Sequence, residues 1–213
     1  MTSVSIQDGS FVLAPLIKTI QENKQYLSDI DGQIGDGDHG INMNKGFTLC
    51  EDQLQKEPGD LSHGFKALSQ ILMTQIGGSM GPLYGMFFKA MARVCKDKAV
   101  LDAASFGEML TAAKDKVQDI SGAQLGDKTL MDVLLPAEES YRAALNANES
   151  FASCLDRMSE AAEKGRDATK DMLAKVGRSS RLGERSRGVI DAGSASCCLI
   201  LQTLAKAIKA KLN

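Results

Sequence analysis

The sequence of 213 residues predicts an all-α protein, built as an up-and-down bundle or barrel of eight antiparallel helices. Apolar residues recur at spacings of three and four, the period of an amphipathic helix, and we find no convincing strand pattern. Short connections between the helices favour antiparallel neighbours. With only four prolines, no Ser/Gly-rich linker and 43% hydrophobic residues, the sequence predicts a single domain over residues 1–213 with one core.

The first four helices follow from periodic apolar residues and from start signals. One helix is expected over residues 12–30 and a second over about 40–56. Asp60 is a favourable N-cap for a third helix. A fourth is expected to follow the Gly-Gly pair at positions 77 and 78.

The second half of the chain predicts four more helices. Ser105 with Glu108 forms a capping-box pair that would open the fifth. The sixth is expected to begin near Lys128, and Pro136 should kink it or split off its first turns. The last two helices are expected over residues 150–176 and 193–212.

Charge and cysteine usage exclude several classes of protein. The formal charge is −2 with mixed signs along the chain, so we expect no nucleic-acid partner and no membrane surface as partner. Five cysteines occur without a C-x-x-C spacing, and the N-terminal residues lack the pattern of a signal peptide. These features predict a cytoplasmic protein with reduced thiols.

Most of the glycine lies in four connections that an up-and-down bundle would place at one end. They are "DGQIGDGDHG" (31–40), "GGSMGPLYG" (77–85), "SGAQLGDKT" (121–129) and "GRSSRLGERSRGVIDAG" (177–193). Polar loops positioned by a rigid scaffold are the usual place for binding and catalysis. We therefore expect a functional site at this end.

The first connection carries Asp31, Asp36 and Asp38 among glycines. These carboxylates could be solvated turn residues, but three like charges held together repel unless a cation lies among them. The loop also opens a helix, which favours Mg²⁺ shared with phosphate groups over Ca²⁺, and the EF-hand spacing is absent. His39, at the start of that helix, is by itself as typical of a cap or a packed ring as of a functional group.

The other three connections carry weaker signals. The glycines of residues 77–85 precede a helix whose free N–H groups could bind an anion, or they could permit close helix packing. In "GDKT", Thr129 offers a hydroxyl, although an ordinary capped helix start is as good an interpretation. The four arginines of residues 177–188 could form a solvated loop or close over a phosphoryl group.

Together, these blocks resemble the DhaL family, the nucleotide-binding subunits of dihydroxyacetone kinases. The resemblance rests on "DGQIGDGDHGINMNKGF", "GGSMGPLYG", "GDKTLMDVLLPA" and "GRSSRLGERS" followed by "DAG", and it covers essentially the whole chain. It implies a closed barrel of eight antiparallel helices that holds ADP or ATP and two Mg²⁺ ions at one end.

The resemblance also implies roles for individual residues. The implied metal ligands are Asp31, Asp36 and Asp38. The implied cofactor-binding residues are His39, Gly40, Ile41, Asn42, Gly78, Ser79, Met80, Ser121, Thr129, Leu130, Arg178, Asp191, Ala192 and Gly193, and Met131 borders the adenine pocket. Arg178 and His39 are the implied catalytic residues. Met80 and Ala192 depart from the serine and proline of the family pattern, which bears on nucleotide exchange and on the acceptor.

A chain of this kind would work with partners. The resemblance implies a DhaK subunit that holds dihydroxyacetone covalently on a histidine, and a DhaM phosphohistidine protein that recharges the bound nucleotide. A homodimer is compatible with the sequence. Free ATP as donor, another small ketose or polyol as acceptor, and a mainly regulatory role stay open as alternatives. The related fatty-acid kinase domain carries "DGDTGTNM" where this chain reads "DGDHGINM", so His39 favours the ketone kinase.

Overall fold

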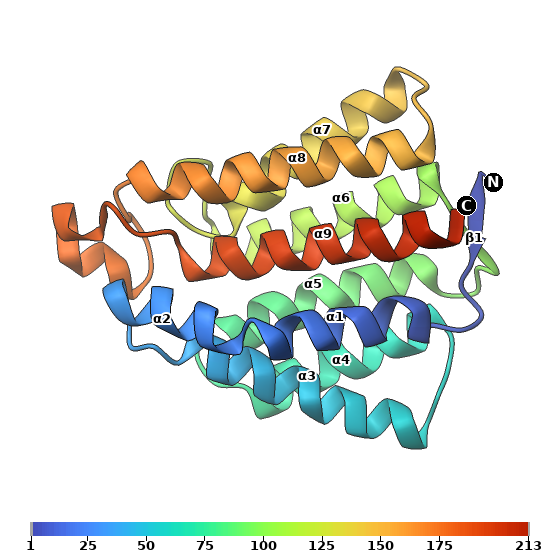
Figure 1. Cartoon of the computed structure of the whole chain (residues 1–213), viewed down its shortest axis with the longest axis horizontal. Coiled ribbons are helices and arrows are strands. Elements are labelled where there is room, and N and C mark those ends of the chain that lie inside the picture. The colour runs from blue at the N-terminus through green and yellow to red at the C-terminus, as the bar shows by residue number, and fades with distance from the viewer. Residues whose placement is uncertain (1, 213) are drawn as a thin grey trace.

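A computed structural model describes residues 2–212, which form nine α-helices, two 3-10 helices and one pair of short strands (Figure 1). The α-helices are α1 (Ser10–Glu22), α2 (Lys24–Ile34), α3 (His39–Lys56), α4 (Leu61–Gln75), α5 (Met80–Cys95), α6 (Ala103–Ser121), α7 (Met131–Asn146), α8 (Phe151–Ala168) and α9 (Ala192–Leu212). The 3-10 helices are η1 (Thr169–Asp171) and η2 (Arg178–Ser186), and the strands are β1 (Ser3–Ser5) and β2 (Val100–Asp102).

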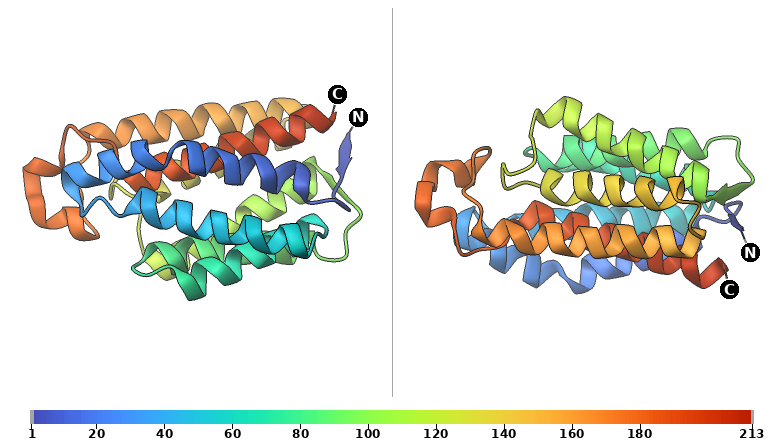
Figure 2. Two further views of the ribbon diagram at one scale, coloured as in Figure 1. Left: turned by 60° about the horizontal axis from the view of Figure 1, so that its bottom comes forward. Right: turned by 90° about the horizontal axis from the view of Figure 1, so that it is seen from above.

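The helices form a closed ring. Helices α3 to α9 each pack against the next, α9 packs against α1, and α1 packs against α3. Helices α1 and α2 together therefore occupy one of the eight helical positions around the barrel. Figures 1 and 2 show the helices running along one axis, with both chain ends at one end of the barrel and α2 with η2 at the other. The predicted all-α barrel of antiparallel helices is confirmed.

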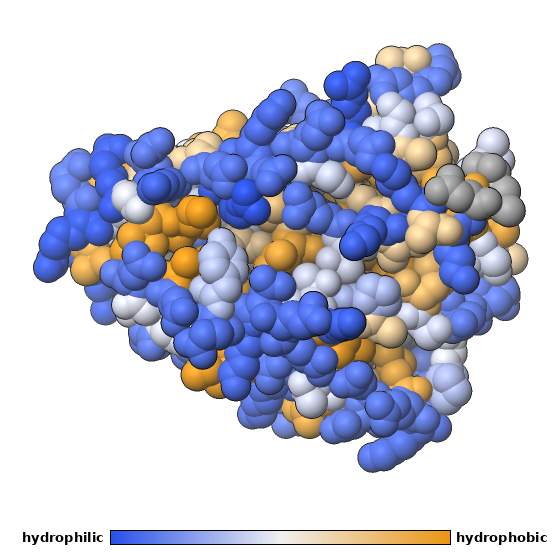
Figure 3. All heavy atoms as spheres, in the orientation of Figure 1, coloured by the Kyte–Doolittle hydropathy of each residue, from blue (hydrophilic) through white to orange (hydrophobic). Residues whose placement is uncertain are grey.

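Aromatic residues fill the interior of the barrel. Phe47, Phe65 and Phe88 are fully buried and their rings pack together, with centroids 6.0 and 5.7 Å from Phe88. On the face shown in Figure 3, polar and charged side chains cover most of the surface and apolar ones reach it in separate patches. All five cysteines are buried and free. Within residues 2–212, no helix combines the length and the hydropathy needed to cross a membrane.

The first predicted helix is in fact two. Helix α1 ends before Asn23 and α2 begins at Lys24, whereas the apolar pattern predicted one helix over residues 12–30. The Asn23 side chain donates to the carbonyl of Thr19 at 2.8 Å, and its own N–H donates to the same carbonyl at 3.1 Å. Asparagine competes for backbone groups in this way, so it interrupts a helix that the apolar pattern alone continues.

The start of α6 and the absence of strands were both predicted wrongly. The N-cap of α6 is Asp102, whose carboxylate accepts the N–H of Ser105 at 2.8 Å, while Ser105 Oγ accepts the N–H of Asp102 at 3.0 Å. Ser105 therefore closes the capping box and does not open it with Glu108. Asp102 also ends β2, which pairs antiparallel with β1. Three-residue strands are too short to give a recognisable alternation.

Helices α7 and α8 also differ from the predicted bounds. Helix α7 begins at Met131, because Lys128 has a left-handed φ of 62°, and it continues through Pro136 instead of being split there. Pro136 cannot donate to the carbonyl of Asp132, and at that point Gly165 lets α8 approach so closely that a Cβ on it would lie 2.2 Å from this oxygen.

Helix α8 ends well before the predicted residue 176. It stops at Ala168 and is followed by η1, where the Thr169 hydroxyl donates to the carbonyl of Arg166 at 2.6 Å. The same hydroxyl oxygen accepts the N–H of Asp191 at 3.1 Å. A side chain that binds both its own helix end and a distant segment stops the helix where the apolar pattern does not.

Candidate nucleotide and metal site

The four glycine-rich connections meet around one cavity of about 480 Å³ at the α2 and η2 end of the barrel. Residues from each connection line it, including Asp31, Gly78, Thr129 and Arg178. This is the size of a typical small-molecule site. The predicted gathering of these loops is confirmed, and their individual roles stay predictions.

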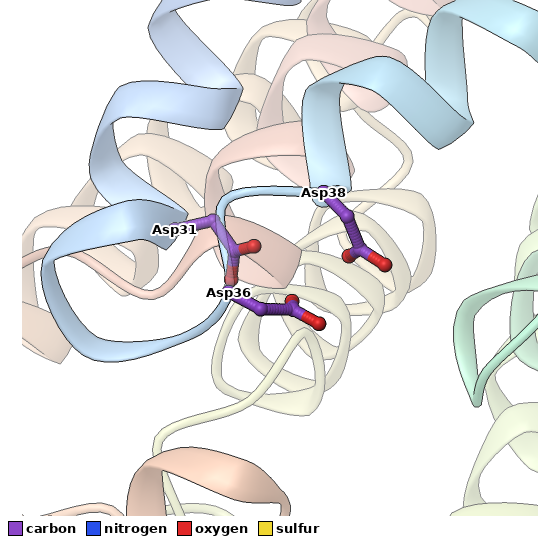
Figure 4. Close-up of side chains that lie close together, drawn as sticks. All are labelled: Asp31, Asp36 and Asp38. Carbon is purple, nitrogen blue, oxygen red and sulfur yellow. The ribbon is translucent and has the colours of Figure 1, made fainter.

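Three carboxylates converge on one side of the cavity (Figure 4). Asp31 lies in the last turn of α2, Asp36 in the connection and Asp38 at the N-cap of α3. One oxygen of each carboxylate lies within 4.8 Å of one oxygen of each other. The α2–α3 connection thus brings together the three residues that the sequence predicted as metal ligands.

These carboxylates accept few hydrogen bonds from the described residues 2–212. Asp31 accepts the N–H of His39 at 3.3 Å, Asp36 forms an ion pair with Arg178, and Asp38 makes no side-chain cap bond although it is an N-cap. Carboxylate oxygens are the ligands that Mg²⁺ prefers. The cluster therefore fits a hard divalent cation, because one guanidinium leaves most of the lone pairs unused.

The start of α3 divides the next four predicted residues into two pairs. His39 and Asn42 line the cavity, whereas Gly40 and Ile41 do not. Gly40 lies against α2, where a Cβ would be 2.0 Å from the carbonyl of Lys24, and the Ile41 side chain is 53% exposed. Gly40 is thus required for close packing of α2 on α3, which sequence reasoning did not identify.

One nitrogen of the His39 ring makes a hydrogen bond to a buried side chain. Its Nε2 lies 2.8 Å from the hydroxyl oxygen of Ser196 on α9. Burial lowers the pKa of His39 to about 4, against the opposing effect of the nearby Asp31 carboxylate. His39 is therefore a neutral imidazole near neutral pH.

The glycines of residues 77–85 serve two different purposes. Gly78 has a left-handed φ of 71° and open space around it, and Ser79 at the N-cap of α5 makes no side-chain cap bond, so the first N–H groups of the helix have no side-chain acceptor from it. Gly81, in contrast, lies against α4, where a Cβ would be 2.3 Å from the carbonyl of Ile76. Close packing is confirmed at Gly81, whereas anion binding at the helix start after Gly78 stays a prediction.

An apolar wall lies beside this helix start. Pro82 and Leu83 of α5, Ile120 at the end of α6 and Val176 line the cavity, and the Ile120 and Val176 side chains are 44% and 39% exposed. Ser121 and Leu130 border the same part, together with the buried Met80. Met131 is fully buried and does not line the cavity. Half-exposed apolar side chains in a cavity suit a flat, apolar ligand group.

A rim segment, residues 172–188, leads across the mouth of the cavity and carries η2. Inside it, Ser186 Oγ accepts the N–H of Ala174 at 3.0 Å and donates to the carbonyl of Gly183 at 2.7 Å. Arg178 of the same segment forms an ion pair with Asp36. The predicted arginine loop therefore contains a 3-10 helix and its own internal hydrogen bonds, and Arg178 meets the carboxylate cluster.

Asp191, Ala192 and Gly193 close the cavity at the start of α9. The Asp191 carboxylate accepts the N–H of Ser194 at 2.7 Å and so caps this helix. Burial raises the pKa of Asp191 to about 6, although Ser194 and Lys128 act in the opposite direction. Its side chain is thus already engaged by the protein.

Comparison with known proteins places this geometry in a family. The DAK2 domain matches residues 33–206. The chain is 37% identical over 190 residues to the ADP-binding subunit DhaL of the PTS-dependent dihydroxyacetone kinase of Lactococcus lactis subsp. lactis (strain IL1403), covering 89% of this chain and 91% of that one. The chain belongs to the DAK2-domain family.

Two further proteins support this membership. The ADP-binding subunit DhaL of the PEP-dependent dihydroxyacetone kinase of Escherichia coli (strain K12) is 37% identical over 186 residues, covering 87% of this DAK2 chain and 89% of that one. The crystal structure of the dihydroxyacetone kinase from C. freundii in complex with AMP-PNP and Mg²⁺ has the same fold, with a TM-score of 0.68 and 21% identity. This chain covers 35% of that longer chain, with 95% of its own length matched.

Two residues that hold this DAK2 site together were not predicted. The carboxylate of Asp132 is 1% exposed and accepts the N–H groups of Gly126 at 2.5 Å and Thr129 at 2.7 Å. Ser194 Oγ then donates to the carbonyl of Thr129 at 2.6 Å. An acidic residue in a first helical turn was a visible signal, but its bonds to N–H groups three and six positions upstream were not.

Lys128 is the second residue that holds the site together and was not predicted. Its side chain is 2% exposed, and its ammonium donates to the carbonyls of Thr169 at 2.5 Å and Val189 at 2.6 Å. These carbonyls lie on either side of the rim segment, so a single ammonium joins its two ends. Burial lowers the pKa of Lys128, while Asp191 acts against this. Neither distant carbonyl could be inferred from the "GDKT" motif.

Proposed function

We propose that this chain is the phosphoryl-transfer subunit of a dihydroxyacetone kinase, and that residues 1–213 act as one nucleotide-binding domain. It holds ADP or ATP with two Mg²⁺ ions and passes the γ-phosphoryl group to dihydroxyacetone, or a similar small ketose, on a DhaK-type partner. The observation that carries this proposal is the convergence of three carboxylates within 4.8 Å, with few hydrogen bonds from the described residues, beside a helix start without a side-chain cap in one cavity.

The separate subunits among the relatives support this arrangement. The Lactococcus and Escherichia proteins are named as ADP-binding subunits, and this chain matches 91% and 89% of their lengths. Their kinases are named PTS-dependent and PEP-dependent, which supports a DhaM-type phosphohistidine protein as donor rather than free ATP. Such a system works in the cytoplasm.

The residues of the cavity divide the work of phosphoryl transfer. Asp31, Asp36 and Asp38 would hold the cations, which when bound offset the charge of the polyphosphate. The N–H groups at the start of α5, after Gly78 and Ser79, would orient the phosphates. The apolar wall of Ile120, Leu130 and Val176 would hold the adenine.

Arg178 would act on the transferred group. It sits on the rim segment with its guanidinium at Asp36, so it reaches the place where the terminal phosphate would meet the cations. A cation that closes over a developing phosphoryl charge contributes mainly to the transition state. The ion pair seen here keeps this guanidinium at the correct side of the cavity.

A reconstituted assay tests this function. With a DhaK-type subunit and a phosphorylated DhaM-type donor, the chain should support formation of dihydroxyacetone phosphate, and Arg178→Gln should lower turnover by about 10³-fold. Arg181→Gln, on the same segment, serves as the matched control and should leave turnover within about twofold of the wild-type value, because an exposed charge away from the reacting group contributes little.

Two outcomes would contradict the proposal. One is an Arg178→Gln chain that loses binding to the DhaK-type partner while it keeps full turnover, which would support a regulatory role. The other is a wild-type chain that yields product with free ATP but none with the phosphorylated donor. Native mass spectrometry of the purified chain gives an independent reading, since ADP retained through purification is expected if the nucleotide acts as a bound coenzyme.

A further inference from the structure

Three side chains from three helices form a hydrogen-bonded cluster in the wall of the cavity. Ser196 Oγ of α9 lies 2.8 Å from His39 Nε2 of α3 and 2.6 Å from the hydroxyl of Tyr84 of α5. Both hydroxyls also approach the carbonyl oxygen of Gly193, at 3.0 Å for Tyr84 and 3.1 Å for Ser196. Ser196 is fully buried and Tyr84 is 1% exposed, so the two hydroxyls are shielded from bulk water.

The number of hydrogens in this cluster decides which nitrogen of His39 carries the proton. Each hydroxyl has one hydrogen to donate. If Nε2 is protonated, it donates to Ser196 Oγ, and the two hydroxyls satisfy two further contacts, so three are made. If Nε2 is unprotonated, the Ser196 hydroxyl must donate its hydrogen to Nε2. Only the Tyr84 hydrogen is then left for the other contacts, so two hydrogen bonds are made. A buried contact left unmade costs free energy, so the Nε2–H form is favoured.

Burial of Tyr84 supports this count of hydrogens in the cluster. Burial raises the pKa of Tyr84 well above its ordinary value, so its hydroxyl keeps its hydrogen near neutral pH. Tyr84 therefore contributes one hydrogen to the cluster near neutral pH. The carbonyl of Gly193 can only accept, so one of the two hydroxyls donates to it and the other donates across the Tyr84–Ser196 contact.

The other ring nitrogen of His39 is left with a free lone pair. Within residues 2–212 no side chain or backbone group hydrogen-bonds to Nδ1, and His39 lines the cavity. We propose that Tyr84 and Ser196 are positioning residues that hold His39 as the Nε2–H tautomer, so that Nδ1 accepts a hydrogen bond from an O–H group of the bound ligand or its water. The ligand in this proposal rests on the proposed function, whereas the tautomer does not.

Nuclear magnetic resonance can read this tautomer directly, because the chain has only two histidines. His63 is the second, with Nε2 3.0 Å from the carbonyl of Glu57, and it provides an internal reference at the other end of the barrel. Two-bond ¹⁵N–¹H correlations on the nucleotide-free protein at about pH 8 should show His39 protonated at Nε2 and bare at Nδ1. A His39 protonated at Nδ1 would overturn the proposal.

Two conservative variants then test the positioning. Ser196→Ala should give a mixture of both His39 tautomers and weaken Mg²⁺-dependent ADP binding by about three- to tenfold. Tyr84→Phe removes a hydroxyl that reaches His39 only through Ser196 and should give a smaller change in the same direction. Tyr141→Phe is the matched control, since it also removes a buried hydroxyl, one that donates to the carbonyl of Ala103 at 2.8 Å, and it should leave the His39 signals unchanged.

The possible failures are distinguishable. If Ser196→Ala keeps the pure Nε2–H signature and full affinity, the positioning role is wrong. If Ser196→Ala does not fold, Tyr84→Phe and the wild-type spectrum still decide the tautomer. If wild-type protein shows the Nε2–H form but binds no ADP, the tautomer assignment holds and the proposed function fails instead.

Discussion

On one side of the cavity the carboxylates of Asp31, Asp36 and Asp38 point at one another, whereas on the other side Asp132 and Asp191 point at backbone N–H groups. Asp132 accepts from Gly126 and Thr129, and Asp191 accepts from Ser194. Asp38 makes no side-chain cap bond at all. The same residue type is thus engaged by backbone N–H groups at Asp132 and Asp191, and much less so in the cluster of Asp31, Asp36 and Asp38.

This difference separates carboxylates that stabilise the fold from carboxylates that we propose as metal ligands. A carboxylate whose oxygens accept N–H groups stabilises the fold whether or not a ligand is present. A cluster of carboxylates with few such donors destabilises the folded state until a cation binds among them. Variants on the two sides should therefore fail in different assays, one in unfolding experiments and the other in binding experiments.

The largest effect on stability is expected at Asp132. Asp132→Ala removes two hydrogen bonds to a buried carboxylate and should lower the free energy of unfolding by about 3 kcal/mol, with or without Mg²⁺. Urea unfolding of the nucleotide-free protein measures this. Asp29→Ala, on the exposed face of α2, is the control and should change stability by less than about 0.5 kcal/mol. Equal stability of both variants would contradict the structural role of Asp132.

A smaller and more local effect is expected at Lys128. Lys128→Met keeps the length of the side chain but leaves the carbonyls of Thr169 and Val189 without their donor, which should cost about 2 kcal/mol. The rim segment, with four arginines, should then be cleaved by trypsin faster than in the wild type, while hydrogen exchange in α4 and α5 stays slow.

Lys175→Met is the matched control for this experiment. Lys175 lies on the same segment, but its ammonium is exposed and 3.5 Å from the Asp127 carboxylate. This variant should lose only the cleavage at its own position. If Lys128→Met resists trypsin as well as the wild type does, the ammonium does not hold the ends of the segment together.

The smallest effect is confined to a window of pH. Asp191 has a pKa of about 6 in the folded protein and 3.8 as its ordinary value, so between these values the folded state binds more protons than the unfolded state. Its contribution therefore lowers stability as pH rises from about 4 to 6 and is constant above that. Asp191→Asn removes this titration, so its stability relative to the wild type should rise with pH across the window. Unfolding by urea at several pH values measures the difference, and a constant difference would contradict the assignment.

The sequence was sufficient for features that depend on near neighbours. Helical periods, the N-cap at Asp60 and the acidic α2–α3 connection were all predicted, and Asp60 does accept the N–H of His63 at 2.7 Å. It was insufficient where distant segments meet. Lys128 binds carbonyls 41 and 61 positions away, and Gly40 is fixed by α2 packing. The break at Asn23 was missed because the apolar pattern continues through it.

Calorimetric titration of ADP into the protein, with and without Mg²⁺, tests the central claim most directly. Asp38→Asn is the decisive variant, because the Asp38 side chain makes no cap bond that could be lost, so the change removes only the charged ligand. Mg²⁺-dependent ADP binding is expected for the wild type and for the control Asp29→Asn, with a loss of about 100-fold in Asp38→Asn. Wild-type affinity in Asp38→Asn, or ADP binding that is indifferent to Mg²⁺, would contradict it.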